Sequence, residues 1–232
     1  MPTHHHATHP STSARWAWTG AGLGLALALI IQAPAHWLTH AIEQASGARV
    51  LMPDPQGSVW NGSSQWLLNE GPLNMASAHR AVALPTRVTW QIAPRLDWAK
   101  LRVSLHATVA SACCTPQPVD IDMSPVWGGV RVQVADHISQ WPAHGLVGLG
   151  APWNTLQPEG QMQLQTTQLQ WTQQQGRGQL QGVVELQMQH LSTRLSTLRP
   201  LGTYRLRVQG GDVIALTLDT REGSLQDRKS VV

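Results

Sequence analysis

Apolar and polar residues alternate along much of the chain, a pattern typical of strands that bury one face. The alternation is clearest in RVTWQI at residues 87–92, LRVSLHATV at 101–109 and VRVQV at 130–134. Successive side chains of a strand point to opposite faces, so each segment predicts a half-buried strand. We therefore expect an all-β fold made of antiparallel strands.

Two long glutamine-rich segments follow the same rule but change phase. In QMQLQTTQLQW, Met162 and Leu164 have one parity, whereas Leu169 and Trp171 have the other. A one-residue change of phase predicts a β-bulge near 166–167. The next run changes parity again between Val184, Leu186, Met188 and then Leu191, Thr193, Leu195. Because bulges bend strands, the sequence predicts a curved sheet and not a flat one.

Turn residues separate these runs. QQGRGQ at 174–179 and Gly210–Gly211–Asp212 each lie between two alternating segments, which predicts two hairpins. Glutamine alternating with apolar residues gives each strand one apolar face and one uncharged hydrogen-bonding face. That polar face suits either solvent or the docking of other protein strands, and the pattern does not choose between them.

The N-terminal region has a different character. From Trp16 to Leu38 there is no Asp, Glu, Lys or Arg, and tryptophans stand near both ends. Such a segment is long enough to cross about 30 Å of hydrocarbon as a helix, and indoles favour the membrane interface. We expect a cytoplasmic tail at 1–15, a transmembrane anchor at 16–38, a short helical linker at 39–48 and a periplasmic β domain at 49–232. The alternative is a signal peptide cleaved after Ala35, at the APA sequence.

Composition narrows the classes of function. Charged residues make up 12% of the chain, and the net charge of +3 comes from arginines that are scattered instead of clustered. Nucleic-acid binding proteins concentrate their positive charge, so this distribution argues against a nucleic-acid partner. A hydrophobic content of 42% is typical of a packed domain, not a disordered one.

The two cysteines, Cys113 and Cys114, are adjacent. A disulfide between neighbours closes a very small ring, so we expect two thiols, with an intermolecular bridge as the alternative. Their spacing also fits no zinc motif.

The sequence offers no motif for catalysis. It has no GxSxG nucleophile elbow, no phosphate-binding loop and no HExxH metal site. Asp136, His137, Ser139 and His144 lie close in sequence, but a catalytic triad is defined by geometry. We therefore expect no enzyme, no cofactor and no metal.

Several long stretches resemble a known family. They are VLMPDPQGSVWNGSSQ at 50–65, PWNTLQPEGQMQL at 152–164 preceded by GLVGLGA, and LSTRLSTLRPLGTYRL at 191–206. Together with PAHWL at 34–38 and LPTRVTWQI at 84–92, they are similar to protein N of the type II secretion system. The resemblance covers about 34–225.

The resemblance implies a single-pass inner-membrane protein with its bulk in the periplasm, where it serves as a non-catalytic accessory of the machine that exports folded proteins. It further implies an AsmA-like half-barrel, meaning a curved, bulged antiparallel sheet after the anchor. The expected partners are other secretion proteins, namely the inner-membrane platform or the secretin, together with membrane lipid. A lipid-binding or lipid-shuttling protein with an apolar concave sheet is the alternative, and a cleaved carbohydrate binder is a third.

Four residues stand out as candidates for docking a partner. Trp153 and Asn154 lie in a proline-fixed loop, Tyr204 opens a strand after a Pro–Gly turn, and Trp60 lies in GSVWNGSSQW. Each has a purely structural interpretation as a turn or corner residue. For Trp60, Gly57 and Gly62 are expected to flank a short strand, with Trp66 in the next turn. An open groove between the two indoles would instead indicate ligand binding.

Overall fold

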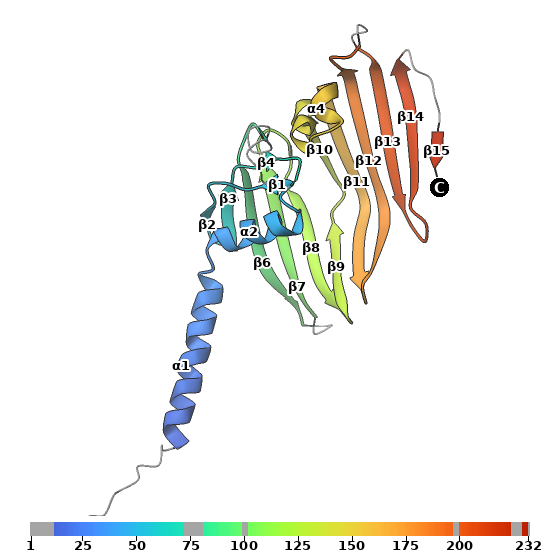
Figure 1. The fold of residues 1–232 in the computed structure, drawn as a ribbon. Helices are drawn as coiled ribbons and strands as arrows, with labels where there is room; N and C mark the ends of the chain where they lie inside the picture. The colour runs from blue at the N-terminus through green and yellow to red at the C-terminus, as the bar shows by residue number, and fades with distance from the viewer. Residues whose placement is uncertain (1–11, 72–80, 99–101, 197–199, 224–228, 232) are drawn as a thin grey trace, which may run out of the picture.

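The computed structural model describes residues 12–71, 81–98, 102–196, 200–223 and 229–231. A long N-terminal helix leads into a shorter helix and a broad, curved sheet (Figure 1). The helical segments are α1 (Thr12–Ile31), α2 (Ala35–Ala45), the 3-10 helix η1 (Ala143–Leu149) and α4 (Trp153–Leu156). The strands are β1 (Val50–Leu51), β2 (Gln56–Gly57), β3 (Asn61–Ser64), β4 (Leu67–Leu68), β5 (Val82–Ala83), β6 (Val88–Asp97), β7 (Arg102–Ser111), β8 (Val119–Val126), β9 (Gly129–Val134), β10 (His137–Pro142), β11 (Glu159–Gln174), β12 (Arg177–Ser192), β13 (Gly202–Gly210), β14 (Ala215–Gly223) and β15 (Lys229–Val231).

The strands form a twelve-stranded sheet and a small three-stranded one. The large sheet follows the order β15-β14-β13-β12-β11-β9-β8-β7-β6-β3-β2, with β10 paired to β11, and the small sheet follows β1-β4-β5. Their pairings are antiparallel. The predicted curved antiparallel sheet is confirmed, and most neighbours in space are also neighbours in sequence.

The phase change in β11 is a β-bulge, as predicted. Pairing with β12 shifts between Thr167 and Gln170, and Gln168 has a φ of 48°. The carboxylate of Asp136 accepts a hydrogen bond of 2.6 Å from the backbone N–H of Gln168, so the bulged amide keeps a partner. β9 pairs with β11 on one side of the bulge and β10 on the other. The bulge therefore lies where the partner of β11 changes from β10 to β9.

The second phase change and both hairpins are also present. The register of β12 against β13 shifts between Met188 and Leu191, and His190 has a φ of 51°. β11 and β12 are joined through Gln175 and Gly176, both with positive φ. A two-residue hairpin loop needs this conformation to match the right-handed twist of its strands. β13 and β14 are joined after Gly210.

The best-packed core lies where α2 covers one end of the sheet. Ala35 of α2, Met52 and Trp90 of β6 are buried together. Partly buried side chains surround them: Leu38, Ile42, Val50, Trp66, Ile92 and Val109. The indole N–H of Trp90 donates to the carbonyls of Ser58 and Val59, at 3.3 and 3.1 Å. This core ties the N-terminal helices to the first strands of the sheet.

The N-terminal apolar segment is divided between two helices. α1 ends at Ile31, and Pro34 makes an isolated bridge to Ser58 before α2 begins at Ala35. Trp37 and Leu38 thus belong to the helix that packs on the domain. None of the helices within the described residues combines the length and apolar character that a membrane crossing needs.

Candidate functional site

The turn that contains Trp60 fastens α1 to the sheet. Trp60 lies between β2 and β3, and its indole N–H donates to the carbonyl oxygen of Ile30 at 2.8 Å. The backbone N–H of Val59 donates to the carbonyl of Ala33 at 2.8 Å, and that of Ile92 to the carbonyl of Trp60 at 2.7 Å. The expected strand between Gly57 and Gly62 was wrong, because the chain reverses there as a hairpin. Trp66 packs against the core instead of facing Trp60 across a groove.

We expect the variant Trp60→Phe to loosen this junction, since phenylalanine keeps the ring but has no N–H. Losing one such hydrogen bond costs about 1 kcal/mol, so protease should cleave the 32–34 segment of the full chain several-fold faster. Trp127→Phe, at an exposed position far from the junction, is the matched control. Equal cleavage rates in both variants would contradict the assigned role of the Trp60 N–H.

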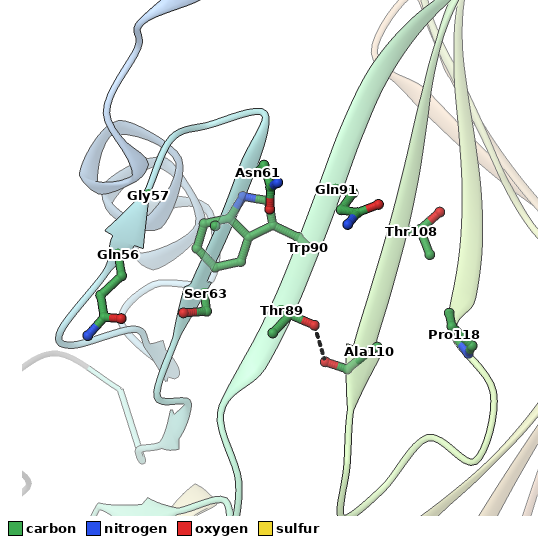
Figure 2. A pocket seen from close by; sticks show the side chains of 11 residues that line it. Gln56, Gly57, Asn61, Ser63, Thr89, Trp90, Gln91, Thr108, Ala110 and Pro118 are labelled. Atoms are coloured by element: carbon green, nitrogen blue, oxygen red, sulfur yellow. Dashed lines mark hydrogen bonds between the residues drawn. The ribbon is translucent and has the colours of Figure 1, made fainter.

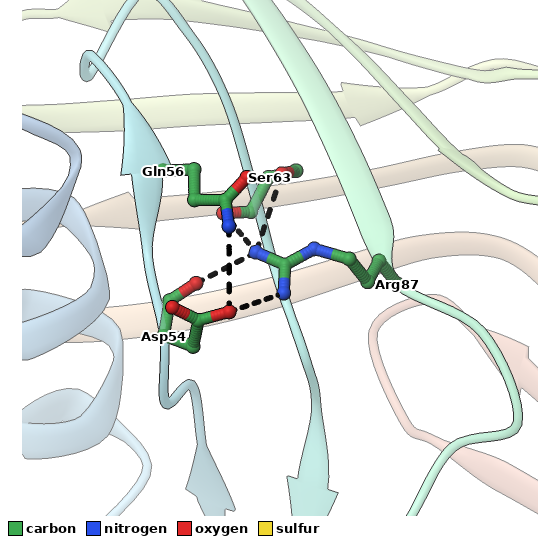
Figure 3. A network of polar contacts seen from close by, with 4 residues as sticks. All are labelled: Asp54, Gln56, Ser63 and Arg87. Atoms are coloured by element: carbon green, nitrogen blue, oxygen red, sulfur yellow. Dashed lines mark hydrogen bonds and ion pairs between the residues drawn. The ribbon is translucent and has the colours of Figure 1, made fainter.

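A polar network holds the same hairpin to β6 (Figure 3). The guanidinium of Arg87 contacts the Asp54 carboxylate and donates to its backbone carbonyl, each at 2.6 Å. Arg87 also lies 3.4 Å from both oxygens of Ser63, and Gln56 donates to Asp54 at 3.4 Å. Asp54 is two-thirds exposed, so the ion pair itself contributes little. The guanidinium instead fixes the position of the hairpin, because it holds Arg87, Asp54 and Ser63 together.

An uncharged pocket of about 610 Å³ lies on the polar face beside this hairpin. Figure 2 shows amide and hydroxyl groups from β2, β3, β6 and β7 around it. The Thr89 hydroxyl is already bonded to the carbonyl of Ala110 at 3.3 Å. Gln56, Ser63 and Thr108 also have side-chain partners, namely Asp54, Arg87 and Asp120. An uncharged lining of this kind suits a neutral hydrogen-bonding ligand, such as a peptide backbone or a sugar hydroxyl.

Farther along the polar face, side chains bond mainly to one another. Gln133 donates to Gln170 at 2.9 Å, and Gln170 donates to Gln181 at 3.3 Å, which forms a ladder across β9, β11 and β12. Glu185 and Arg205 form a half-buried ion pair of 2.9 Å on β12 and β13. The alternating glutamines therefore stabilise the sheet itself.

The opposite face carries rows of apolar side chains that run across the strands. One row pairs Leu105, Met123, Val132 and Trp171, and another pairs Leu164, Leu186, Leu206 and Leu218. Leu105, Trp171 and Leu218 are exposed, together with Leu96, Val103 and Leu216. α2 and η1 cover only part of this face, so an extended apolar surface is open to a ligand or partner.

The candidate docking residues lie on separate elements. Trp153 and Asn154 are half-buried on α4, where Asn154 accepts a hydrogen bond of 3.2 Å from the Thr155 hydroxyl. Tyr204 is half-buried in β13, opposite Met188 and Thr220. Figure 1 places the turn with Trp60 next to α1, α4 at one end of the sheet and β13 far across it. They do not form one site, and partner docking by any of them stays a prediction.

The expectation of two free thiols was wrong, because Cys113 and Cys114 are joined by a disulfide. They lie in the turn after β7, where the backbone N–H of Cys113 donates to the Thr86 hydroxyl and that of Cys114 to the carbonyl of Ser111. These bonds fix a tight turn that brings the adjacent sulfurs together. Cys114 is buried, and its carbonyl accepts a hydrogen bond of 2.7 Å from the backbone N–H of Gln140 in β10.

A second cleft, of about 580 Å³, contains His137 of β10. Burial lowers the pKa of His137 below its usual 6.5, and the charge of Asp120 partly opposes this. Its Nε2 atom finds no hydrogen-bond partner among the described residues. Burial thus favours the neutral form of the ring.

This depressed pKa predicts a pH dependence of stability. The unfolded chain binds a proton at His137 more readily than the folded chain, so the free energy of unfolding falls as pH decreases below about 6.5. Above that pH, His137 is neutral in both states and contributes no slope. We expect His137→Gln to reduce the loss between pH 7.5 and 5, measured by urea titration of the full chain. Identical slopes in variant and wild type would contradict the assignment.

The sequence did not reveal one cluster of titratable groups. His106 of β7 lies 2.9 Å from the Asp122 carboxylate and 3.4 Å from that of Asp120, which also accepts a bond from the Thr108 hydroxyl. The two aspartates share a parity, but only the pairing of β7 with β8 places them beside the histidine. No group of three or more such residues in the described parts of the chain is arranged to hold a metal ion.

Comparison with known proteins agrees with the fold and the motifs. A family model described as type II secretion system (T2SS), protein N, matches residues 48–228, nearly the whole sheet domain. None of the curated proteins and none of the solved structures matches the chain.

Proposed function

Because the chain belongs to the family of type II secretion system protein N, we propose that it is an accessory of the secretion machine, held in the inner membrane by α1 and acting by protein contacts. Membership makes it a component of protein export in the cell envelope that interacts with other type II secretion proteins. The family is one of secretion accessories and is not known as an enzyme family. The anchor, the periplasmic position and the contact surface are proposals.

The surface of α1 supports the anchor. From Trp16 to Ile31 its side chains are uncharged and exposed, and Thr19 is the one polar side chain among them. A helix that is apolar all round is stable only when protein or lipid covers it. Residues 33–35 support its retention, because Ala33 and Ala35 are buried in the domain. Cleavage after Ala35 would remove both the Ala33 and Ile30 carbonyls that the Trp60 turn binds.

The open apolar face is the observation that carries the proposal of protein contacts. Leu105, Trp171 and Leu218 are exposed on this face, as are Leu96, Val103 and Leu216. Large exposed apolar surfaces mark interaction sites, and burying such surface gives about 25 cal/mol per Å². One free edge of the sheet is less suited: β3 pairs with β6 only as far as Gln91, and the part of β6 beyond it contains Pro94, which lacks a donor N–H.

Photocrosslinking in bacterial membranes tests this proposal. A photoreactive amino acid replaces Leu105 or Leu218 on the apolar face, and Gln133 on the polar face serves as the control. We expect adducts with inner-membrane platform proteins or the secretin from the first two positions only. Equal adducts from Gln133, or adducts of lipid or sugar alone, would overturn the proposal.

The same apolar face favours a second candidate, the binding of a lipid acyl chain. The rows from Leu105 to Trp171 and from Leu164 to Leu218 give a long apolar path across the strands. Native mass spectrometry of the full chain released gently from detergent distinguishes the two. Retained phospholipid that is lost when Leu105 and Leu218 are replaced by aspartate supports lipid binding, whereas an empty chain argues against it.

A further inference from the structure

Four hairpins lie at one end of the large sheet, which we term the hairpin end. They join β6 to β7, β8 to β9, β11 to β12 and β13 to β14. Because the strands are antiparallel and successive, all four connections fall at the same end. Three of the four hairpins expose large apolar groups there: Leu96 and Trp98, then Trp127, then Val213 and Ile214. Trp98 is 76% exposed and Trp127 is 88% exposed, which is costly for an indole in water.

α1 leaves the domain toward this same end. Its last turn is bonded to Trp60, and the carbonyl of Trp60 is bonded to Ile92 in the middle of β6. From Ile92, β6 continues to Asp97 at the hairpin end. Figure 1 shows α1 and the adjoining ends of β6 and β7 on the same side of the domain.

The length of β6 beyond Ile92 decides how close the hairpin end comes to a bilayer that receives α1. The five residues after Ile92 extend β6 by about 17 Å. The end of α1 is held near Ile92, and both elements run toward the same side of the domain (Figure 1). The end of β6 at Asp97 therefore lies at the level of the last turns of α1. A bilayer that receives α1 meets this end of β6.

The side chains at the hairpin end fit a bilayer surface. Trp98 and Trp127 present indoles, which prefer the headgroup region because they join an apolar ring to an N–H donor. Arg95, Arg102 and Arg177 are exposed beside them, against Asp97 and Asp212. Arginine side chains near a membrane place their charge among lipid phosphates.

Resting on the proposed anchoring by α1, we propose that the hairpin end is a second membrane contact. Trp98 and Trp127 insert into the headgroup region beside the anchor, with arginines on the anionic phosphates. The sheet then stands with its strands rising from the bilayer, and its apolar face opens sideways, where a partner can reach it. The second contact acts together with the hydrogen bond from Trp60 to Ile30, which holds α1 to the sheet, to fix the orientation of the domain on the membrane.

Site-specific fluorescence of the full chain tests this contact. The variants Trp98→Cys and Trp127→Cys are each labelled with the environment-sensitive dye NBD and reconstituted in vesicles of phosphatidylethanolamine and phosphatidylglycerol. The native cysteines are paired and do not take the label. Leu195→Cys is the control, because Leu195 is exposed and apolar but lies past β12, at the opposite end. We expect blue-shifted emission at 98 and 127 that is lost when the vesicles contain a lipid-linked nitroxide, and neither effect at 195.

Three other results would overturn the second membrane contact. Labels at 98 and 127 that match 195, in a chain recovered with the vesicles after alkaline washing, overturn the second contact and leave the anchor. A chain that stays outside the vesicle fraction overturns the anchor and this inference together. Blue-shifted labels that lipid nitroxide does not quench show that protein covers the hairpin end, and they also overturn the inference.

Discussion

Replacing Trp90 with alanine is expected to lower the free energy of unfolding by about 3–5 kcal/mol, the usual range for a buried tryptophan. Trp90 is 4% exposed and packs with Ala35 and Met52 under α2. Its loss would also leave the carbonyls of Ser58 and Val59 without the indole donor. Urea titration of the full chain in detergent measures the change.

Trp127→Ala is the matched control for this experiment. The same atoms are removed from a side chain that is 88% exposed, so the expected change is within about 0.5 kcal/mol. The comparison separates burial from the intrinsic effect of losing an indole. Similar losses in the two variants would show that the core assigned to Trp90 is not the one that stabilises the domain.

The second large effect is expected at Gly182, where β12 passes the bulge in β11. Gly182 has a φ of 92°, and an added Cβ would meet the carbonyl oxygen of Gln168 well inside contact distance. The left-handed backbone costs about 1–2 kcal/mol for alanine, and forcing two backbones apart costs about 1–3 kcal/mol more. We expect Gly182→Ala to lower the free energy of unfolding by about 2–5 kcal/mol in the same titration.

Gly176→Ala isolates the steric part of that loss. Gly176 also has a positive φ, of 78°, but an added Cβ would meet no atom within 4 Å. Only the backbone cost of about 1–2 kcal/mol applies there. A loss at Gly182 no larger than the loss at Gly176 would mean that the strands can separate at the bulge, contrary to the close pairing described.

The periodicity of the sequence was enough to locate the main strands and their β-bulges. A strand buries alternate residues, so one inserted residue inverts the pattern, and the shifts near 166–167 and between Met188 and Leu191 could be read directly. The short β2–β3 hairpin was missed because β2 has two residues and β3 has four, too few to show a periodicity. The turn around Trp60 looked like a strand flanked by glycines.

The candidate sites were less predictable than the strands. Trp153, Asn154 and Tyr204 stood out by residue type, but residue type does not say which elements meet in space. The pairing of Cys113 with Cys114 depends on a turn fixed by Thr86, which is far away in sequence. Likewise, His106 meets Asp120 and Asp122 only through the register of β7 and β8.

The sequence by itself determined the alternating strands, the bulges that curve the sheet, the apolar N-terminal segment and the motifs of the family, because each is written in local order. The tertiary structure decided that α1 ends at Ile31, that Trp60 holds this end to the sheet, and that α1 and the exposed indoles of Trp98 and Trp127 lie at one end. The hydrogen bonds at this end join residues 26–32 positions apart, such as Ala33 with Val59 and Trp60 with Ile92. Local pattern cannot specify such relations, because they arise only when the strands pair.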